Sequence, residues 1–220
     1  MEKIMVLIPA CNEERFIGNL IKKIKEIYKF KVIVVDDGSK DNTYLEASKV
    51  ADYVIRHEVN KGKGQSIIDG LNFVFKKCEY LILMDGDFQH SPEDIKNFIG
   101  TDFSKYDIVI GKREMNFKNM PFDRYLTNRT TTLVTSLLAT KRVFDSQSGF
   151  RMVKVDSMKR LNLKYKRFQI ESEMLIKAGR MKMNIGYVDI QTIYGDERSK
   201  INKVLDTLRF IKMSLEMLCL

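Results

Sequence analysis

A strand-length apolar run that ends in two carboxylates is the feature that most constrains this chain. Residues 80–84 are apolar, and Asp85, Gly86 and Asp87 follow at once. A short apolar run without polar alternation is typical of a strand that is covered on both faces, as in the parallel sheets of α/β proteins. Open sheets of this kind bind ligands at the carboxyl ends of their strands. The two aspartates are therefore predicted to lie at a ligand-binding edge.

The side chains of this stretch favour a divalent cation. The carboxylates of Asp85 and Asp87 and the amide oxygen of Gln89 are the hard ligands that Mg²⁺ or Mn²⁺ prefers, and these ions in turn bind phosphate oxygens. Gly86 lets the backbone turn tightly and approach a ligand. Aspartates after a strand are also common in turns and helix caps, so this stretch alone does not establish a metal site.

Apolar strands alternate with helical patterns along the first half of the chain. The predicted strands cover residues 3–8, 31–35, 53–55, 80–84 and 107–110. We expect Asn12 to cap the first helix and Ser91, followed by Pro92, to cap the helix after the aspartates. The alternation predicts a single α/β domain with a mainly parallel, Rossmann-like central sheet and helices on both faces. Further helices at 124–138 and from 201 onward, with a strand at 184–190, complete the expected elements.

Composition narrows the function classes. A net charge of +9 favours anionic partners such as nucleotides, phosphates or an anionic membrane face. The chain has no helix-turn-helix, zinc-finger or aromatic RNA-binding motif, so no nucleic-acid partner is expected. The three cysteines, Cys11, Cys78 and Cys219, have neither zinc spacing nor a disulfide pattern. Without a signal segment or a run of membrane-span length, the expected location is the cytoplasm.

A glycine loop with two lysines, at residues 60–64, precedes a predicted helix. It matches neither the Walker A loop nor the dinucleotide fingerprint, which would need a third glycine at position 67. Lysines at a helix start could hold phosphate, and an ordinary solvated turn is the alternative.

Taken together, the separate motifs resemble one family. The motifs are Ile8 to Glu13, Val35 to Ser39 with Asp41 and Thr43, Asn60 to Gly64, Met84 to His90, Gln147 to Arg151, Phe168 to Glu173, and Ser199 with Lys200. In this order they resemble the family 2 nucleotide-sugar glycosyltransferases with the GT-A fold. More narrowly, they are similar to the dolichyl-phosphate mannosyltransferase and polyprenyl-phosphate glucosyltransferase group. The resemblance spans residues 4–205.

The resemblance implies roles for the donor half, residues 1–113. It places a nucleotide-sugar beside Pro9, Asn12 and Glu13, with Asp37 recognising the base. The loop that carries Lys63 would lie by the nucleotide. Asp85, Asp87 and Gln89 would bind Mg²⁺ or Mn²⁺, with Gly86 between the two carboxylates. Many relatives have Ala at the position of Gly86, a difference that we expect to be harmless.

The resemblance also implies phosphate-binding residues. Arg113, at the end of the donor half, and Arg124 and Arg129, in the acceptor half (residues 114–200), would meet the acceptor phosphate or the donor diphosphate. Ser199 and Lys200 match a phosphate-contacting loop of that group. The expected catalytic residues are Asp87, Arg113, Arg129 and Glu173. Many relatives continue into membrane helices beyond the position of Leu220.

The implied reaction is an inverting, metal-dependent transfer of a hexose from a donor of the GDP-mannose or UDP-glucose type to a polyprenyl or dolichyl monophosphate. An ionised phosphate needs no general base, whereas a hydroxyl acceptor would need a carboxylate such as Glu171 or Glu173. Transfer to a soluble hydroxyl therefore stays open. A sugar nucleotidylyltransferase would want a glycine-rich loop with arginine in place of Pro9 to Glu13, and a non-catalytic nucleotide-binding module would be expected to lose the aspartates.

The C-terminal segment, residues 201–220, is predicted to form an amphipathic helix. One side carries Val204, Leu208, Ile211 and Leu215, and Lys203, Arg209 and Lys212 lie among them. Such a helix could contact the inner face of a membrane peripherally. The alternative is that it packs on the domain or on a partner chain.

Overall fold

One seven-stranded sheet organises the chain, in the order β3-β2-β1-β4-β6-β5-β7. The computed structural model describes residues 1–113, 122–191 and 203–219. The strands are β1 (Glu2–Ala10), β2 (Lys31–Asp36), β3 (Tyr53–Arg56), β4 (Cys78–Leu83), β5 (Ile108–Arg113), β6 (Arg151–Lys154) and β7 (Ile185–Ile190).

The sheet is mainly parallel, as predicted, with one reversed strand. Leu7 of β1 lies between Ile33 of β2 and Leu83 of β4, and these three strands run in one direction. Only β6 is antiparallel to its neighbours, β4 and β5. The sequence did not predict this strand, because its four residues include only two apolar side chains, Met152 and Val153, between Arg151 and Lys154, too few for a recognisable strand pattern. The six codirectional strands end at one edge, where Asp36 and Asp85 lie at or just beyond their strand ends.

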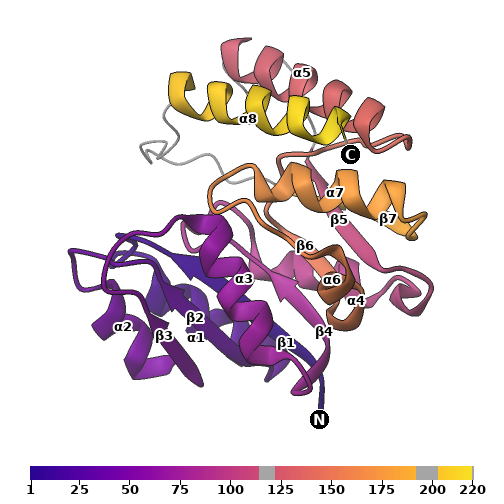
Figure 1. The fold of residues 1–220 in the computed structure, drawn as a ribbon. Helices are drawn as coiled ribbons and strands as arrows, with labels where there is room; N and C mark the ends of the chain where they lie inside the picture. The colour runs from indigo at the N-terminus through magenta and orange to yellow at the C-terminus, as the bar shows by residue number, and fades with distance from the viewer. Residues whose placement is uncertain (114–121, 192–202, 220) are drawn as a thin grey trace.

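Helices cover both faces of the sheet, as the near-continuous apolar strands require (Figure 1). One face packs against α1 (Ile17–Tyr28), α2 (Thr43–Val50) and α4 (Ile95–Ile99). The other packs against α3 (Lys63–Val74), α6 (Val155–Leu161) and α7 (Ile170–Arg180). Leu7, Ile33 and Leu81 are fully buried, and each such side chain contributes about 1.5–3 kcal/mol to stability. Two 3₁₀ turns, Pro92–Asp94 and Phe103–Lys105, flank α4.

A third layer lies outside α7 and consists of α5 (Phe122–Leu138) and α8 (Lys203–Leu218), which run side by side (Figure 1). Leu138, Ile176, Met213 and Met217 form the small apolar cluster that joins these helices to α7. The leucine-rich side predicted for α8 points elsewhere, since Leu208 and Leu215 are more than half exposed. In the described part of the chain, no helix is long and apolar enough to cross a bilayer.

Two predicted helix caps differ from the structure. The first helix begins at Ile17, not directly after Asn12, and Asn12 adopts a left-handed backbone with φ 55°. The Asn12 side chain instead accepts a hydrogen bond from the backbone N–H of Lys40 at 2.8 Å. Ser91 does occupy the cap position before Pro92, but its hydroxyl pairs with Glu93 and caps no backbone N–H. Both side chains therefore hydrogen-bond to groups other than the backbone N–H groups of the following helix.

Candidate functional site

Lys63 joins two carboxylates at the centre of the carboxyl edge. Its Nζ lies 2.6 Å from Asp85 Oδ1 and 2.7 Å from Glu171 Oε1. The three residues come from the start of α3, the end of β4 and the first turn of α7. Glu171 Oε2 is buried and accepts no hydrogen bond from the residues that the structure describes. In this cluster one ammonium therefore contacts two carboxylates, and Glu171 Oε2 is an acceptor atom that the ammonium does not use.

The charges of this cluster stabilise one another. Burial alone would raise the pKa of Asp85, but the Lys63 ammonium, helped by Arg113, outweighs burial and holds that pKa below its usual range. Burial alone would lower the pKa of Lys63, but Asp85 and Glu171 outweigh it and raise that pKa. Both groups are consequently charged at neutral pH.

Gly149 makes room for Asp85. A Cβ at position 149 would lie 2.5 Å from Asp85 Oδ2, closer than atoms can approach. The segment around Gly149 is held by Arg151, whose guanidinium is fully buried and donates to the backbone carbonyls of Ser146, Ser148 and Glu171 at 2.8–3.0 Å. Arg151 thus ties this segment to the first turn of α7. Both residues belong to the predicted motif at residues 147–151, from which the sequence alone assigns no role to either.

Asp87, Gly86 and Gln89 follow in a tight turn. The backbone N–H of Gln89 donates to Asp87 Oδ1 at 3.1 Å, and Phe88 between them has φ 62°. Gly86 lies against the end of β1, where an added Cβ would make ordinary contacts of 3.4–3.5 Å with Ile8, Ala10 and Glu13. This spacing agrees with the expectation that alanine is harmless there.

The donor set fits a divalent cation that is shared with phosphate. Among the described residues, no three His, Cys, Asp or Glu side chains form a ready-made metal cage. Magnesium-type sites in phosphate-binding proteins usually have only one or two carboxylates, with substrate phosphates and water completing the shell. Asp85 and Asp87 match that pattern.

His90 is buried close to Asp85 and Lys63. It is 4% exposed and packs on Phe150, with ring centroids 5.4 Å apart. Burial lowers the pKa of His90 to about 4, while Asp85 works in the other direction. A neutral imidazole therefore lies beside the aspartates. Sequence reasoning missed it, although the chain has only two histidines and this one follows Gln89 directly.

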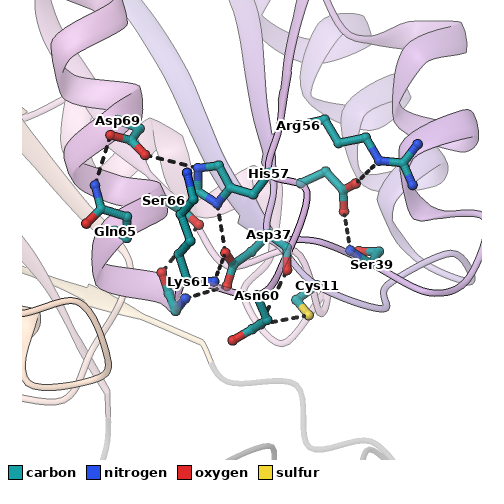
Figure 2. Close-up of polar contacts among 12 residues, drawn as sticks. Cys11, Asp37, Ser39, Arg56, His57, Asn60, Lys61, Gln65, Ser66 and Asp69 are labelled. Atoms are coloured by element: carbon teal, nitrogen blue, oxygen red, sulfur yellow. Dashed lines mark hydrogen bonds and ion pairs between the residues drawn. The ribbon is translucent and has the colours of Figure 1, made fainter.

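The other histidine, His57, anchors the loop at the end of β2 (Figure 2). Its Nδ1 lies 2.8 Å from Asp37 Oδ1, and its Nε2 lies 3.0 Å from Asp69 Oδ2 on α3. The Asp37 carboxylate also accepts the backbone N–H groups of Lys61 and Gly62, both at 2.8 Å. Asp37 is only 3% exposed. It is thus the anchor of the glycine loop, and three of the roughly four acceptor directions of a carboxylate are used by the protein. Base recognition by Asp37 stays a prediction.

Hydrogen bonds from backbone N–H groups to side chains also join the segment after β1 to the segment after β2. The backbone N–H of Asn12 donates to Ser39 Oγ at 2.9 Å, and that of Glu13 donates to Thr43 Oγ1 at 2.6 Å. Pro9 pairs with Val35 across the sheet. The structure therefore brings Pro9, Asn12 and Glu13 to the same edge as the aspartates.

The structure separates the two glutamates that were considered together. Glu173 is fully buried, and its carboxylate accepts the backbone N–H groups of Lys164 and Tyr165 and pairs with Lys177 at 2.6 Å. The segment that Glu173 holds supports the glycine loop, because the carbonyl of Lys166 lies only 2.3 Å from where a Cβ of Gly62 would be. Glu173 therefore does not lie with Lys63 and Asp85, whereas Glu171 does. The expected catalytic role of Glu173 finds no support in this placement.

The predicted cations are distributed unevenly. Arg113 is buried and forms a two-pronged pair with Asp145, with Nε 2.8 Å from Oδ2 and Nη2 2.9 Å from Oδ1. Arg129 is exposed on α5, near the ring of Tyr125. Arg124 begins the same helix, but its side chain is outside the described part. Ser199 and Lys200 also lie outside the described residues.

Comparisons with known proteins agree with this geometry. The model for "Glycosyl transferase family 2" matches residues 5–161. A UDP-N-acetylglucosamine–dolichyl-phosphate N-acetylglucosaminyltransferase of Methanococcus voltae is 38% identical over 217 residues, covering 87% of this chain and 86% of the relative. The dolichol-phosphate mannosyltransferase of Pyrococcus furiosus is 29% identical and covers 95% of this chain, which spans 62% of that protein.

Solved structures confirm the fold. Glucosyl-3-phosphoglycerate synthase from Mycobacterium tuberculosis, crystallised with UDP, superposes with a TM-score of 0.77 over 98% of this chain and 80% of its own, at 18% identity. The same enzyme has been crystallised with Mn²⁺ and UDP-glucose. These neighbours have the GT-A fold predicted from the sequence. The chain therefore belongs to glycosyl transferase family 2, with the polyprenyl-phosphate glycosyltransferases among its relatives.

Proposed function

We propose that this protein transfers a sugar from a nucleotide-sugar to a polyprenyl monophosphate. The observation that carries this choice of acceptor is the placement of the two glutamates. Glu173 is bonded to backbone N–H groups and Lys177, and Glu171 is paired with Lys63. Both oxygens of Glu173 are thus engaged, and Glu171 is held against Lys63 beside the proposed metal ligand Asp85, a placement that suits a support of the diphosphate site. A phosphate monoester is already ionised at neutral pH and needs no carboxylate base.

The donor diphosphate is proposed to lie along the strand ends, between the glycine loop and the two aspartates. A divalent cation held by Asp85 and Asp87, with Gln89 as a further ligand, would stabilise the charge that develops on the leaving diphosphate. Lys63 lies within reach of the same position, 2.6 Å from Asp85. Pro9, Asn12, Glu13 and Asp37 border the space for the nucleoside.

The nucleotide is proposed to be a uridine diphosphate. The relative from Methanococcus voltae is named for UDP-N-acetylglucosamine, whereas the sequence predicts a hexose donor of the UDP-glucose or GDP-mannose type. An N-acetylhexosamine is thus added to glucose as a candidate sugar on UDP, and GDP-mannose is the alternative donor. Arg113, Arg124 and Arg129, with Ser199 and Lys200, stay the proposed phosphate-binding groups.

The acceptor lipid is proposed to reach the site along the layer formed by α5 and α8. Leucines on both helices, including Leu133, Leu137 and Leu208, are more than half exposed. Such a surface suits peripheral contact with a membrane, where apolar side chains enter the acyl boundary while basic residues meet anionic headgroups. This contact would bring the phosphate of the membrane-bound acceptor to the protein, whose proposed donor site lies at the carboxyl edge of the sheet.

The direct test is product formation by the purified protein with Mn²⁺ or Mg²⁺. UDP-N-acetylglucosamine, UDP-glucose and GDP-mannose are each supplied with and without a polyprenyl monophosphate, and labelled lipid and nucleoside diphosphate are measured. We expect release that depends on the lipid and is lost in Asp87→Ala. Lipid-independent transfer to a soluble hydroxyl would contradict the proposed acceptor.

A further inference from the structure

Lys63 is a largely buried cation that contacts carboxylates at the end of β4 and the start of α7, beside the proposed donor site. Its side chain is 16% exposed, and its ammonium contacts carboxylates from β4 and α7 at 2.6 and 2.7 Å. The Lys63 ammonium also lies 5.9 Å from the centroid of the Phe168 ring, which comes two residues before α7. Asp85, one of the two proposed metal ligands, is therefore already bonded to a cation that belongs to the protein.

The backbone beneath Lys63 is fixed, so a change of partner would involve only the side chain. Gly62 and Gly64 pack against the carbonyls of Lys166 and Tyr165, where a Cβ would come within 2.3 and 2.2 Å. The backbone N–H of Gln65 donates to the Lys166 carbonyl at 3.0 Å. The four-carbon stem of lysine, by contrast, is flexible and ends in a point charge that can exchange partners.

The carboxylates around the ammonium are ligands that a second cation could share. Lys63 contacts one oxygen of Asp85 and one oxygen of Glu171. Glu171 Oε2 is buried without a hydrogen-bond partner among the described residues. The guanidiniums of Arg113 and Arg151 also act on Asp85, so a divalent cation that binds this carboxylate would enter a cluster of protein cations and compete with the nearest of them, the Lys63 ammonium.

We propose that the Lys63 ammonium competes with the divalent cation for Asp85, and that the donor diphosphate relieves this competition by binding the ammonium. Lys63 is then a positioning residue that couples metal and nucleotide binding. The inference rests on the proposed metal site. By linkage the coupling is reciprocal, so Mn²⁺ tightens UDP binding by the same factor as UDP tightens Mn²⁺ binding.

The test is the affinity of the nucleotide-free protein for Mn²⁺, measured by calorimetry, and of the same protein with UDP. Lys63→Met removes the competing ammonium, and we expect it to tighten Mn²⁺ binding without nucleotide by about tenfold. The factor by which UDP improves Mn²⁺ binding should shrink accordingly. A merely structural or metal-supporting lysine would leave Mn²⁺ binding unchanged or weaken it, and either result overturns the inference.

A matched control separates this competition from general electrostatics. Lys61 lies two residues away in the same loop, and its side chain is exposed. Lys61→Met removes the same charge, and we expect it to change Mn²⁺ affinity less than twofold or so, because exposed charges are well screened. An equal gain in both variants would show that net charge alone is responsible and would overturn the inference.

A second variant and a thermal measurement guard against loss of folding. Lys63→Met leaves two carboxylates without their cation, so its metal-free Tm should fall and Mn²⁺ should raise that Tm more than in the wild type.

Glu171→Gln is the second variant. It removes one of the two carboxylates that hold the Lys63 ammonium, so the ammonium binds Asp85 alone and Mn²⁺ should bind more weakly. Tighter binding would contradict the inference. If the wild type binds Mn²⁺ but Lys63→Met binds it no better, only the competition is wrong. If neither protein binds Mn²⁺ with or without UDP, the proposed metal site is wrong and the inference falls with it.

Discussion

The carboxyl edge of the sheet and the layer of α5 and α8 are built on opposite principles. At the edge, polar side chains such as Asp37, Asp145 and Arg151 are buried and bonded to backbone groups or to opposite charges. In the helix layer, apolar side chains face outward. Nine of the fifteen exposed large apolar residues in the described part of the chain lie on α5 and α8.

The difference indicates a division of labour. Chemistry on a charged leaving group needs preorganised charges, and these require a rigid and fully bonded surrounding. Contact with a lipid surface needs only a sufficient apolar area, which tolerates variation in its individual side chains. Single substitutions should therefore cost much at the edge and little in the helix layer.

The largest effect is expected from Asp87→Ala. Removing one of two carboxylate ligands should lower transfer by about a thousandfold or more, because the charge on the leaving diphosphate loses its counter-ion. Asp189→Ala serves as the matched control, since its side chain is 86% exposed on β7. Turnover assays of both variants check this, and retention of more than a tenth of the wild-type rate in Asp87→Ala would argue against the metal site.

Gly149→Ala should have the next largest effect. The new Cβ would lie 2.5 Å from Asp85 Oδ2, so the carboxylate or the segment around it must move. We expect a loss of about 1–3 kcal/mol in the free energy of unfolding from overpacking, with a fall in transfer rate. Gly86→Ala provides the contrast, because its Cβ would make only ordinary contacts. Similar damage from both substitutions, seen by urea unfolding and activity, would show that Asp85 is not seated as described.

Glu173→Gln tests whether this glutamate is a base or a support. It weakens the acceptor for the N–H groups of Lys164 and Tyr165 and breaks the pair with Lys177. We expect about 2–4 kcal/mol lower stability from the buried groups left without partners. The pH profile of kcat should keep its shape. Loss of a basic limb from that profile, at unchanged stability, would restore Glu173 as a catalytic base.

The smallest effect on stability is expected in the helix layer. Leu208 and Leu215 are 58% and 59% exposed, so changing both to Gln should alter the free energy of unfolding by about 0.5 kcal/mol or less. Binding to vesicles that contain anionic lipid should nevertheless fall, as measured by co-sedimentation. Met213→Gln is the contrasting variant on the same helix, because Met213 is fully buried and its replacement should destabilise the protein. Unchanged vesicle binding in the double leucine variant would contradict the proposed membrane contact.

Much of the edge could be predicted because its signals are local. The apolar run before Asp85 and the turn residues after it are contiguous, and parallel strands place such segments at one edge. The partners of these residues are not local. Arg113 pairs with Asp145, which lies 32 residues away, and Asp37 reaches Gly62 across 25 residues. No pattern in a single sequence encodes those distances.

Glu171 and Glu173 show the same limit on a smaller scale. Two residues apart at the start of one helix, both end up buried, yet they point to different neighbours. Only the packing of α7 on the glycine loop decides that Glu171 meets Lys63. The outward orientation of the leucines on α8 likewise depends on Met213 and Met217 facing α7, which the apolar pattern alone did not indicate.

The most direct test of the central claim compares two acceptors that share one polyprenyl chain, the monophosphate and the free alcohol. Each acceptor is supplied in the same vesicles with Mn²⁺ and with whichever of UDP-N-acetylglucosamine, UDP-glucose and GDP-mannose proves to be the donor. Because the edge offers an electrostatic setting for a phosphate, and because Glu173 is fully engaged and Glu171 is paired with Lys63, we expect labelled product from the monophosphate alone. Transfer to the alcohol at a comparable rate would contradict the account, since it would require a base that the glutamates do not provide.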